Sequence, residues 1–175
     1  MMLRNLILLL FFNTALAAQT PTITEVRTMY HNSSEDGTSC RKLVDMLSAY
    51  TPATNPLLAG YEGGALMMLA KHAFNPFTKL SYFKKGRKIL EAAIVADAQN
   101  TELRFIRFAT QCDAPGFLGY DDNLNEDKSF LLKALENMKD KELKNWIVGF
   151  MKNSKYLSET EKRKLNAEGN AFIGR

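Results

Sequence analysis

Residues Gly60–Pro76, with the sequence GYEGGALMMLAKHAFNP, decide how the fold is interpreted. Glycines ahead of an apolar run also occur where a loop grips a phosphate group. A phosphate-binding loop of that kind needs a preceding strand and the spacing GxxxxGK[ST], and this stretch has neither. On a helix, Gly60 and Gly64 lie one turn above each other and leave a shallow groove for a neighbouring helix. The stretch therefore predicts close helix packing, with an anion site at the helix amino end as the alternative.

The next segment, NPFTKLSYFKKGRKILEAAIVADAQN, predicts the helix that packs on these glycines. Asn75 is the expected N-cap, and Pro76 stands at the first helical position, where proline is favoured. The segment is apolar on two sides, which is typical of a helix that lies between neighbours. We therefore expect this helix at the centre of the fold, in contact with Gly60 and Gly64.

Helical periodicity recurs along the rest of the chain, while alternation of apolar and polar residues is nearly absent. We predict an all-α domain of about six or seven helices in antiparallel pairs, as a helical bundle or a short degenerate repeat array. KSFLLKALENM and KELKNWIVGFMKN predict a helical hairpin, and Ser158 with Glu161 forms a capping-box pattern. Residues 166–175 have no helical pattern, so we expect a loosely ordered tail.

Part of the chain resembles a tetratricopeptide repeat. In KGRKILEAAIVADAQN, Gly86 and Ala93 stand at the small positions of the repeat's second helix and Leu90 at the bulky one. Asp97–Asn100 resembles the usual D-P-x-N turn, with Ala98 in place of proline. The preceding segment lacks the W-x-x-L-G-x-x-Y signature, so the resemblance covers about one repeat.

A longer string, from NPLLAGYEGG to CDAPGFLGY, is similar to small exported proteins of unknown function from Gram-negative bacteria. This resemblance covers most of the chain after its first residues. It implies a periplasmic or secreted setting, and it implies no activity and no catalytic residue.

The first residues, MMLRNLILLLFFNTALAAQ, have the parts of a secretory signal. A basic residue precedes the apolar core Leu6–Phe12, and the small residues Ala15 and Ala17 follow. The core is too short to cross a hydrocarbon layer of about 30 Å as a helix. We expect residues 1–17 to be cleaved and residues 18–175 to form a single exported domain, with no transmembrane segment after cleavage.

The charge of the chain argues against a nucleic-acid partner. The formal net charge is +4, from 23 Lys and Arg against 19 Asp and Glu. Both signs are mixed along the chain, whereas nucleic-acid binders concentrate basic residues on one face. We interpret Lys79, Lys84, Lys85, Arg87 and Lys88 as a solvated rim around the helix that contains them.

Two cysteines, Cys40 and Cys112, follow the signal. In an oxidising compartment they could form a disulfide, and the alternative is a pair of buried thiols that act as small apolar residues. Both lie on apolar helical faces. We therefore favour buried thiols.

No catalytic residue, metal ligand or cofactor is predicted. GxSxG and HExxH are absent, and isolated histidines such as His72 are interpreted as part of the core edge. Asp121 and Asp122 are neighbouring acids in a polar loop, where carboxylates are usually solvated. A small envelope hydrolase stays an alternative that would require Asp121, Asp122, His72 or a cysteine to meet in one cleft.

The preferred function is interaction with a protein or peptide partner in the cell envelope. Arg104 and Arg107 stand one turn apart on a helix that leads into a loop with Phe117 and Tyr120. Guanidinium groups bind carboxylates in a forked geometry, and aromatic rings supply rigid apolar contact area. These four residues are the predicted partner-binding site. A carrier of an apolar ligand is a further alternative, because the many Met and Phe side chains could line a cavity.

Overall fold

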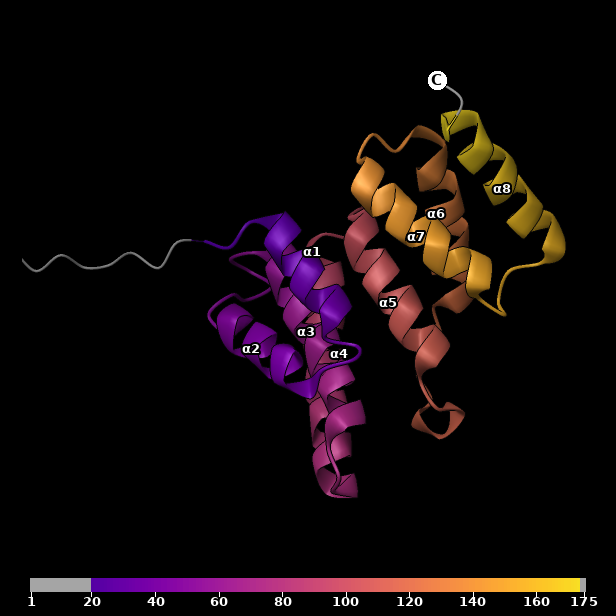
Figure 1. Cartoon of the computed structure of the whole chain (residues 1–175). Helices are drawn as coiled ribbons and strands as arrows, with labels where there is room; N and C mark the ends of the chain where they lie inside the picture. The colour runs from indigo at the N-terminus through magenta and orange to yellow at the C-terminus, as the bar shows by residue number, and fades with distance from the viewer. Residues whose placement is uncertain (1–19, 174–175) are drawn as a thin grey trace, which may run out of the picture.

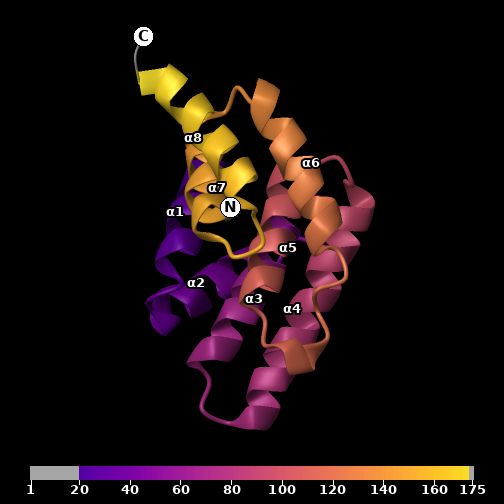
Figure 2. The same ribbon diagram turned by 90° about the vertical axis from the view of Figure 1, so that its right-hand side faces the viewer.

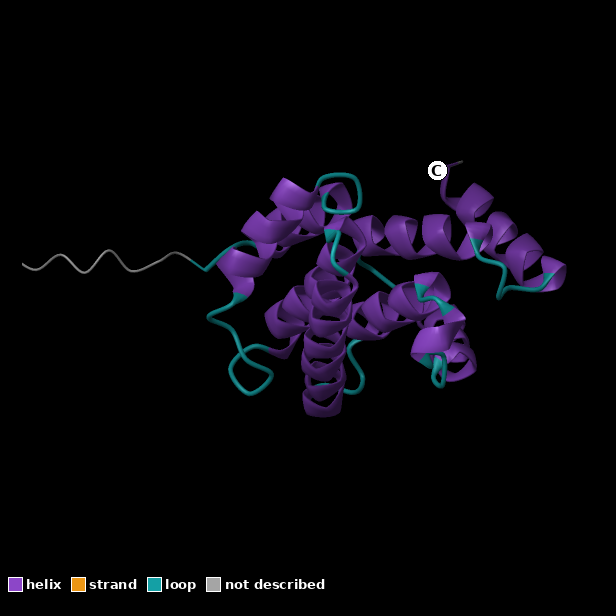
Figure 3. Cartoon of the chain, turned by 90° about the horizontal axis from the view of Figure 1, so that it is seen from below, coloured by secondary structure: helices purple, strands orange, loops and turns teal. Residues whose placement is uncertain are grey.

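The computed structural model describes residues 20–173, with side chains placed as far as Asn166. The predicted signal peptide, residues 1–17, lies outside the described residues. Within them the chain forms eight α-helices, one short 3-10 helix and no strand (Figure 3). The all-α prediction is confirmed, and the number of helices is close to the six or seven expected.

The helices are labelled in chain order in Figure 1. Their bounds are α1 Ile23–Asn32, α2 Gly37–Leu47, α3 Pro56–His72, α4 Pro76–Ala96, α5 Thr101–Asp113, η1 Gly116–Leu118, α6 Leu124–Asn137, α7 Lys141–Asn153 and α8 Glu159–Ile173. None of the helices in this part of the chain combines the length and apolar character needed to cross a membrane.

Asparagine caps set the starts of the long helices. The Asn75 side chain accepts hydrogen bonds from the backbone N–H groups of Phe77 and Thr78, and Pro76 follows at the first helical position. Asn55 caps α3 in the same way, again with a proline after it. These side chains satisfy N–H groups that have no partner within the helix. The predicted cap at Asn75 is therefore confirmed.

The α3–α4 hairpin is the most extensive helix pairing in the molecule, and its two arms run antiparallel (Figure 2). The two helices touch backbone to backbone at Gly63 and Gly86. A carbon added at Gly63 would lie 2.8 Å from the carbonyl oxygen of Gly86 and 2.8 Å from the amide nitrogen of Leu90. A carbon added at Gly86 would in turn overlap the carbonyl oxygen of Gly63. Only glycine at both positions permits this approach.

Gly60 and Gly64 were expected to contact α4, but they face other helices. A carbon added at Gly64 would lie 2.5 Å from the Tyr30 hydroxyl of α1 and 2.9 Å from Ile106 Cγ2 of α5. One added at Gly60 would overlap Leu103 of α5, with α4 further away. Both glycines therefore pack against helices, but the main partner is α5 rather than α4.

The most buried helix is α3, which corrects the expectation that α4 is central. In α3, 12 of the 17 residues are buried, whereas α4 exposes Phe77 and Val95, each 84% accessible. The glycines and alanines of α3 let α1, α2, α4 and α5 all approach it closely. The second apolar side of α4 covers less of the core than its pattern suggested.

Two apolar cores meet at α5, which separates α1–α4 from α6–α8 (Figure 1). Leu103 and Ile106 of α5 belong to the first core, and Phe105 and Phe108 belong to the second. A helix can contribute to cores on opposite sides only if it is apolar around most of its circumference. The sequence of α5 has this property.

The expected hairpin of α6 and α7 is not present in the structure. The closest helical neighbour of α6 is α5 instead. Leu131 and Leu135 of α6 and Ile147 of α7 nevertheless share the second core. At α8, Ser158 and Glu161 form the predicted capping box. The helix then continues to Ile173, although its last part has no helical apolar pattern.

Candidate functional site

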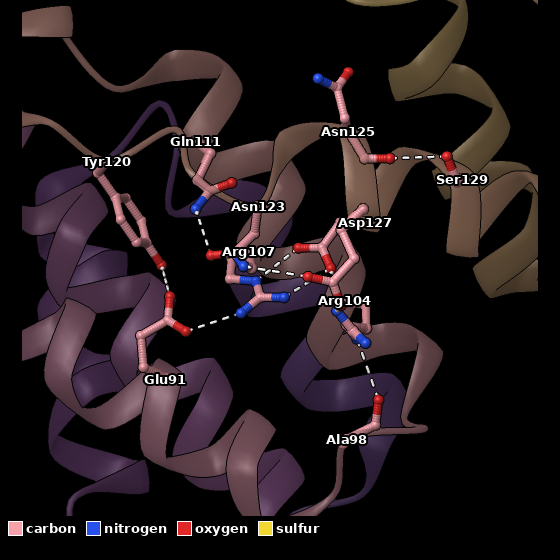
Figure 4. Close-up of polar contacts among 11 residues, drawn as sticks. Glu91, Ala98, Arg104, Arg107, Gln111, Tyr120, Asn123, Asn125, Asp127 and Ser129 are labelled. Atoms are coloured by element: carbon pink, nitrogen blue, oxygen red, sulfur yellow. Dashed lines mark hydrogen bonds and ion pairs between the residues drawn. The ribbon is translucent and has the colours of Figure 1, made fainter.

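Arg107 lies inside the protein, where acidic side chains occupy its donors (Figure 4). Its Nε and Nη2 donate to the two carboxylate oxygens of Asp127 on α6, at 2.6 and 2.8 Å. Its Nη1 donates to Glu91 of α4 at 2.9 Å. Burial alone would lower the pKa of Arg107, but the hydrogen bonds and charges of Asp127 and Glu91 together outweigh this effect and raise it. Arg107 therefore joins α4, α5 and α6 as a permanent cation.

Arg104 shares the same carboxylate. Its Nη1 donates to Asp127 at 2.7 Å and to Glu126 at 2.5 Å, and its Nε donates to the carbonyl oxygen of Ala98. The Arg104 side chain is only 11% exposed. The hydrogen bond from Arg104 also holds the pKa of Glu126 below its usual range. A partner carboxylate would therefore have to displace internal ones.

Tyr120 is also an interior residue, 3% exposed, and its hydroxyl donates to Glu91 at 2.6 Å (Figure 4). Burial, followed by the hydrogen bond to Glu91, raises the pKa of Tyr120. The Arg87 guanidinium lies 4.7 Å from the ring centroid and also donates to the carbonyl oxygen of Gly119. These contacts attach the loop between α5 and α6 to α4. Phe117 differs from Tyr120, since it is 87% exposed on η1.

The structure thus does not bring the four predicted residues together on one surface. Arg104, Arg107 and Tyr120 belong to an internal polar network around Glu91 and Asp127. Sequence reasoning missed both acids, because they are distant in the chain and nothing in the local pattern marks them as buried. Phe117 alone lies at a different surface feature of the protein.

That feature is an open groove of about 1110 Å³ between α3, α4, η1, α5 and α7, with the end of α1 at its edge. We call it the apolar groove. It is defined by the large apolar side chains Met68, Leu80, Phe105, Phe117, Trp146 and Phe150.

The wall of the groove formed by α5 and α7 is built of interlocked aromatic rings. The Trp146 ring stands edge-on to Phe105 with centroids 4.9 Å apart, and Phe105 stands in the same way 5.7 Å from Phe150. Tyr30 supports the other side of Trp146 at 5.9 Å. Such edge-to-face contacts hold the rings in fixed positions.

Two further features of the groove matter for binding. Gly149 of α7 lines it, and a carbon added there would have open space around it, with no heavy atom within 4 Å. At the rim, Lys71 and Asp113 form an exposed ion pair at 2.9 Å, and Lys79 lies nearby. The lining of the groove is therefore mostly apolar, and its ion pair Lys71–Asp113 is exposed.

The residues considered for catalysis lie in separate surroundings. His72 Nε2 is 3.1 Å from the carbonyl oxygen of Ser33, while Asp121 and Asp122 are exposed in the loop before α6. Among the described residues, no group of three or more His, Cys, Asp or Glu side chains is arranged to hold a metal ion. The structure gives the hydrolase alternative no assembled site.

The two cysteines are free thiols in different cores. The Cys40 thiol donates to the carbonyl oxygen of Ala65 at 3.1 Å, and Cys112 lies 3.7 Å from the Ser154 hydroxyl. Burial raises the pKa of each thiol to about 11. Both act as small apolar residues here, the alternative that the sequence favoured.

Known proteins add no guidance. Comparisons of the chain with models of protein families, with curated proteins and with solved structures found no match. The resemblances to a tetratricopeptide repeat and to small exported proteins therefore stay predictions.

Proposed function

We propose that this protein is an interaction module that binds an apolar segment of a protein or peptide partner in the apolar groove. The observation that carries the proposal is a large open groove with fixed aromatic walls and a mostly apolar lining. The secretory signal in the first residues supports a periplasmic or secreted setting for this interaction.

The lining of the groove suits a peptide better than a drug-sized molecule. Small-molecule sites usually measure about 300–1000 Å³ and use a few precisely placed polar groups to orient the ligand. At about 1110 Å³ the groove lies near the upper end of that range, and its large lining side chains are apolar. An amphipathic helix that lays its apolar face into such a groove needs no internal polar contacts.

The lining residues also have the chemistry of a peptide groove. Trp146 and Phe150 supply rigid aromatic area, which is enriched among residues that dominate binding energy, and the buried Phe105 supports both rings. Met68 lines the opposite side, and its half-buried, flexible side chain can adapt to different partner residues. Rigid and adaptable walls together suit the recognition of short apolar motifs.

The proposal can be tested with peptides selected from a random displayed library against the whole protein. Affinities of the selected peptides are then measured by titration calorimetry for the wild type, Gly149→Glu and Phe117→Ser. Gly149→Glu places a carboxylate in the apolar groove without a steric clash, so we expect it to weaken binding about tenfold or more. Phe117→Ser removes an exposed wall of the groove and should also weaken binding.

A matched control is Val95→Ser, which removes a similarly exposed apolar side chain that does not line the groove. We expect it to bind the peptides as the wild type does. Equal affinity of the wild type and Gly149→Glu for the selected peptides would show that the groove is not the binding site.

A carrier of an apolar ligand is the second candidate, favoured by the same scarcity of polar groups inside the groove. Native mass spectrometry of the purified protein separates the two functions. A carrier should retain a small apolar molecule that is lost in Gly149→Glu, whereas an interaction module should be free of small ligands and still bind peptides.

A further inference from the structure

The tip of the α3–α4 hairpin projects beyond the rest of the molecule (Figures 1 and 2). It carries exposed aromatic side chains. Phe74, in the turn, is 101% exposed, and Phe77, in the first turn of α4, is 84% exposed. Neither residue lines the apolar groove. Because large apolar side chains on a protruding tip cover none of the core, they mark a contact surface.

The part of the hairpin between Gly63 and Leu90 carries charge of one sign. From Gly63 to Leu90 the sequence contains no Asp and no Glu. It contains six basic residues, which are Lys71, Lys79, Lys84, Lys85, Arg87 and Lys88. In the described part of the chain, Lys71 is paired with Asp113, while Lys79, Lys84 and Lys88 have no acidic partner. These lysines therefore do more than form a solvated rim. They concentrate positive charge on the same part of the hairpin as the exposed phenylalanines.

The helical register places cations behind the phenylalanine. Phe77, Lys84 and Lys88 are spaced by nearly whole turns of the helix, so they share one side of α4. All three side chains are exposed. At 1.5 Å per residue, Lys79 lies about 3 Å along the axis from Phe77 and Lys84 about 10 Å. The order from the tip inwards is therefore aromatic rings first and cations next.

The backbone of the tip is suited to a low-dielectric environment. The N–H groups of Phe77 and Thr78, which begin the helix, donate to the Asn75 side chain, and Pro76 has no N–H. Entry of the first turn of α4 into an apolar layer would thus leave these donors with a partner. Free donors are the main cost of placing a helix end in such a layer.

We propose that the hairpin tip docks on an anionic lipid surface. Phe74 and Phe77 insert at the boundary between headgroups and acyl chains, as the apolar side of an interfacial helix does. Lys79 and Lys84 then lie at the level of the anionic headgroups, within a Debye length of about 8–10 Å. A convex tip with rings at its apex and cations behind it matches a flat anionic surface. The two phenylalanines lie outside the groove, whereas Lys79 stands at its rim.

The experiment is co-sedimentation of the whole protein with phosphatidylcholine vesicles that do or do not contain phosphatidylglycerol. We expect binding only to the phosphatidylglycerol vesicles, and we expect it to weaken as salt is added. Phe74→Ser/Phe77→Ser should lower the partition coefficient about tenfold or more, since each ring contributes a large apolar area. The triple variant Lys79→Gln/Lys84→Gln/Lys88→Gln should lower it similarly.

Matched controls use the same chemistry elsewhere on the surface. Val95→Ser removes an apolar side chain as exposed as Phe77 from the other end of α4. Lys42→Gln/Lys133→Gln/Lys139→Gln removes three exposed charges from other elements. Both controls should bind vesicles as the wild type does. Every variant keeps the same amino terminus, so any contribution of Leu6–Phe12 is the same in each, and circular dichroism verifies that each one is folded.

A second measurement reports directly on insertion. Trp146 is the only tryptophan in the sequence, so Phe77→Trp adds one probe at the tip. Its fluorescence should shift to the blue and be quenched by brominated lipid only when phosphatidylglycerol is present. Equal binding of the wild type and Phe74→Ser/Phe77→Ser to these vesicles would overturn the proposal. No binding to phosphatidylglycerol vesicles would overturn it as well, and would leave the peptide groove unaffected.

Discussion

Arg27 of α1 and Glu102 of α5 form a buried two-point ion pair. Arg27 Nε lies 2.7 Å from Oε1 of Glu102, and Nη2 lies 2.7 Å from Oε2. The two side chains are 8% and 5% exposed. Arg27 also contacts Asp140, the N-cap of α7, at 2.8 Å, and Tyr61 donates a short hydrogen bond to Glu102. One guanidinium thus joins the first helix to the two helices that form the groove wall.

Loss of Glu102 should be strongly destabilising. Glu102→Ala leaves the Arg27 charge buried with only partly exposed partners, and removing one member of a buried pair typically costs about 3–5 kcal/mol. Glu142 also contacts Arg27, at 3.3 Å, but its side chain is 52% exposed. Glu142→Ala should therefore cost less than about 1 kcal/mol. Urea unfolding followed by circular dichroism measures both, and similar losses for the two variants would contradict the role given to Glu102.

The glycines of α3 and α7 should respond to alanine in opposite directions. Gly63→Ala forces α3 and α4 apart at their backbone contact, and such overpacking costs about 1–3 kcal/mol. Gly149→Ala meets open space in the middle of α7, so it should stabilise the protein by up to about 1 kcal/mol through helix propensity. Thermal unfolding compares them.

A larger residue where α3 meets α1 and α5 should damage folding more. Gly64→Leu would collide with Tyr30 and Ile106, so we expect it to fail to fold or to melt well below the wild type. An unchanged melting temperature in Gly64→Leu or Gly63→Ala would count against this packing.

Glu62 should make stability depend on pH. Burial raises the pKa of the Glu62 carboxyl above its ordinary value of 4.5, and Lys85, at 3.9 Å, offsets this only in part. The folded state then binds the proton more tightly than the unfolded chain. The free energy of unfolding attributable to this group therefore falls as pH rises from about 4.5 through the raised pKa, and it levels off above.

Glu62→Gln removes this titration, so the variant should be more stable than the wild type at neutral pH, with a difference that shrinks towards acid. Denaturant unfolding across the pH range measures it. Glu136→Gln, at an exposed position of α6, is the control and should follow the wild type. A Glu62→Gln protein that is less stable than the wild type at neutral pH would show that the carboxylate has a stabilising role.

Local patterns predicted the helices well, because caps and apolar periodicity act over a few residues. Asn75 with Pro76 and Ser158 with Glu161 marked helix starts that the structure contains. The apolar circumference of α5 agrees with its position between the two cores. These features depend on one helix at a time, so the sequence of that helix is sufficient.

The pairing of helices was harder to predict, because it depends on residues far apart in the chain. The choice of α4 as the centre rested on its two apolar sides, whereas the contact is decided by Gly63 of α3 meeting Gly86 of α4. Arg107 was expected at a binding surface because nothing local identified Asp127 as its buried partner. The apolar groove likewise forms from five helices and could not be read from any one of them.

The most direct test of the proposed function follows the methionine methyl groups by NMR while a selected peptide is added. Met68 lines the groove and is half-buried, whereas Met46 packs on the first core away from it and Met151 lies inside the second core. We predict that the peptide shifts the Met68 signal and leaves the Met46 and Met151 signals unchanged. Shifts confined to Met46 or Met151, with Met68 unaffected by saturating peptide, would contradict the proposed groove.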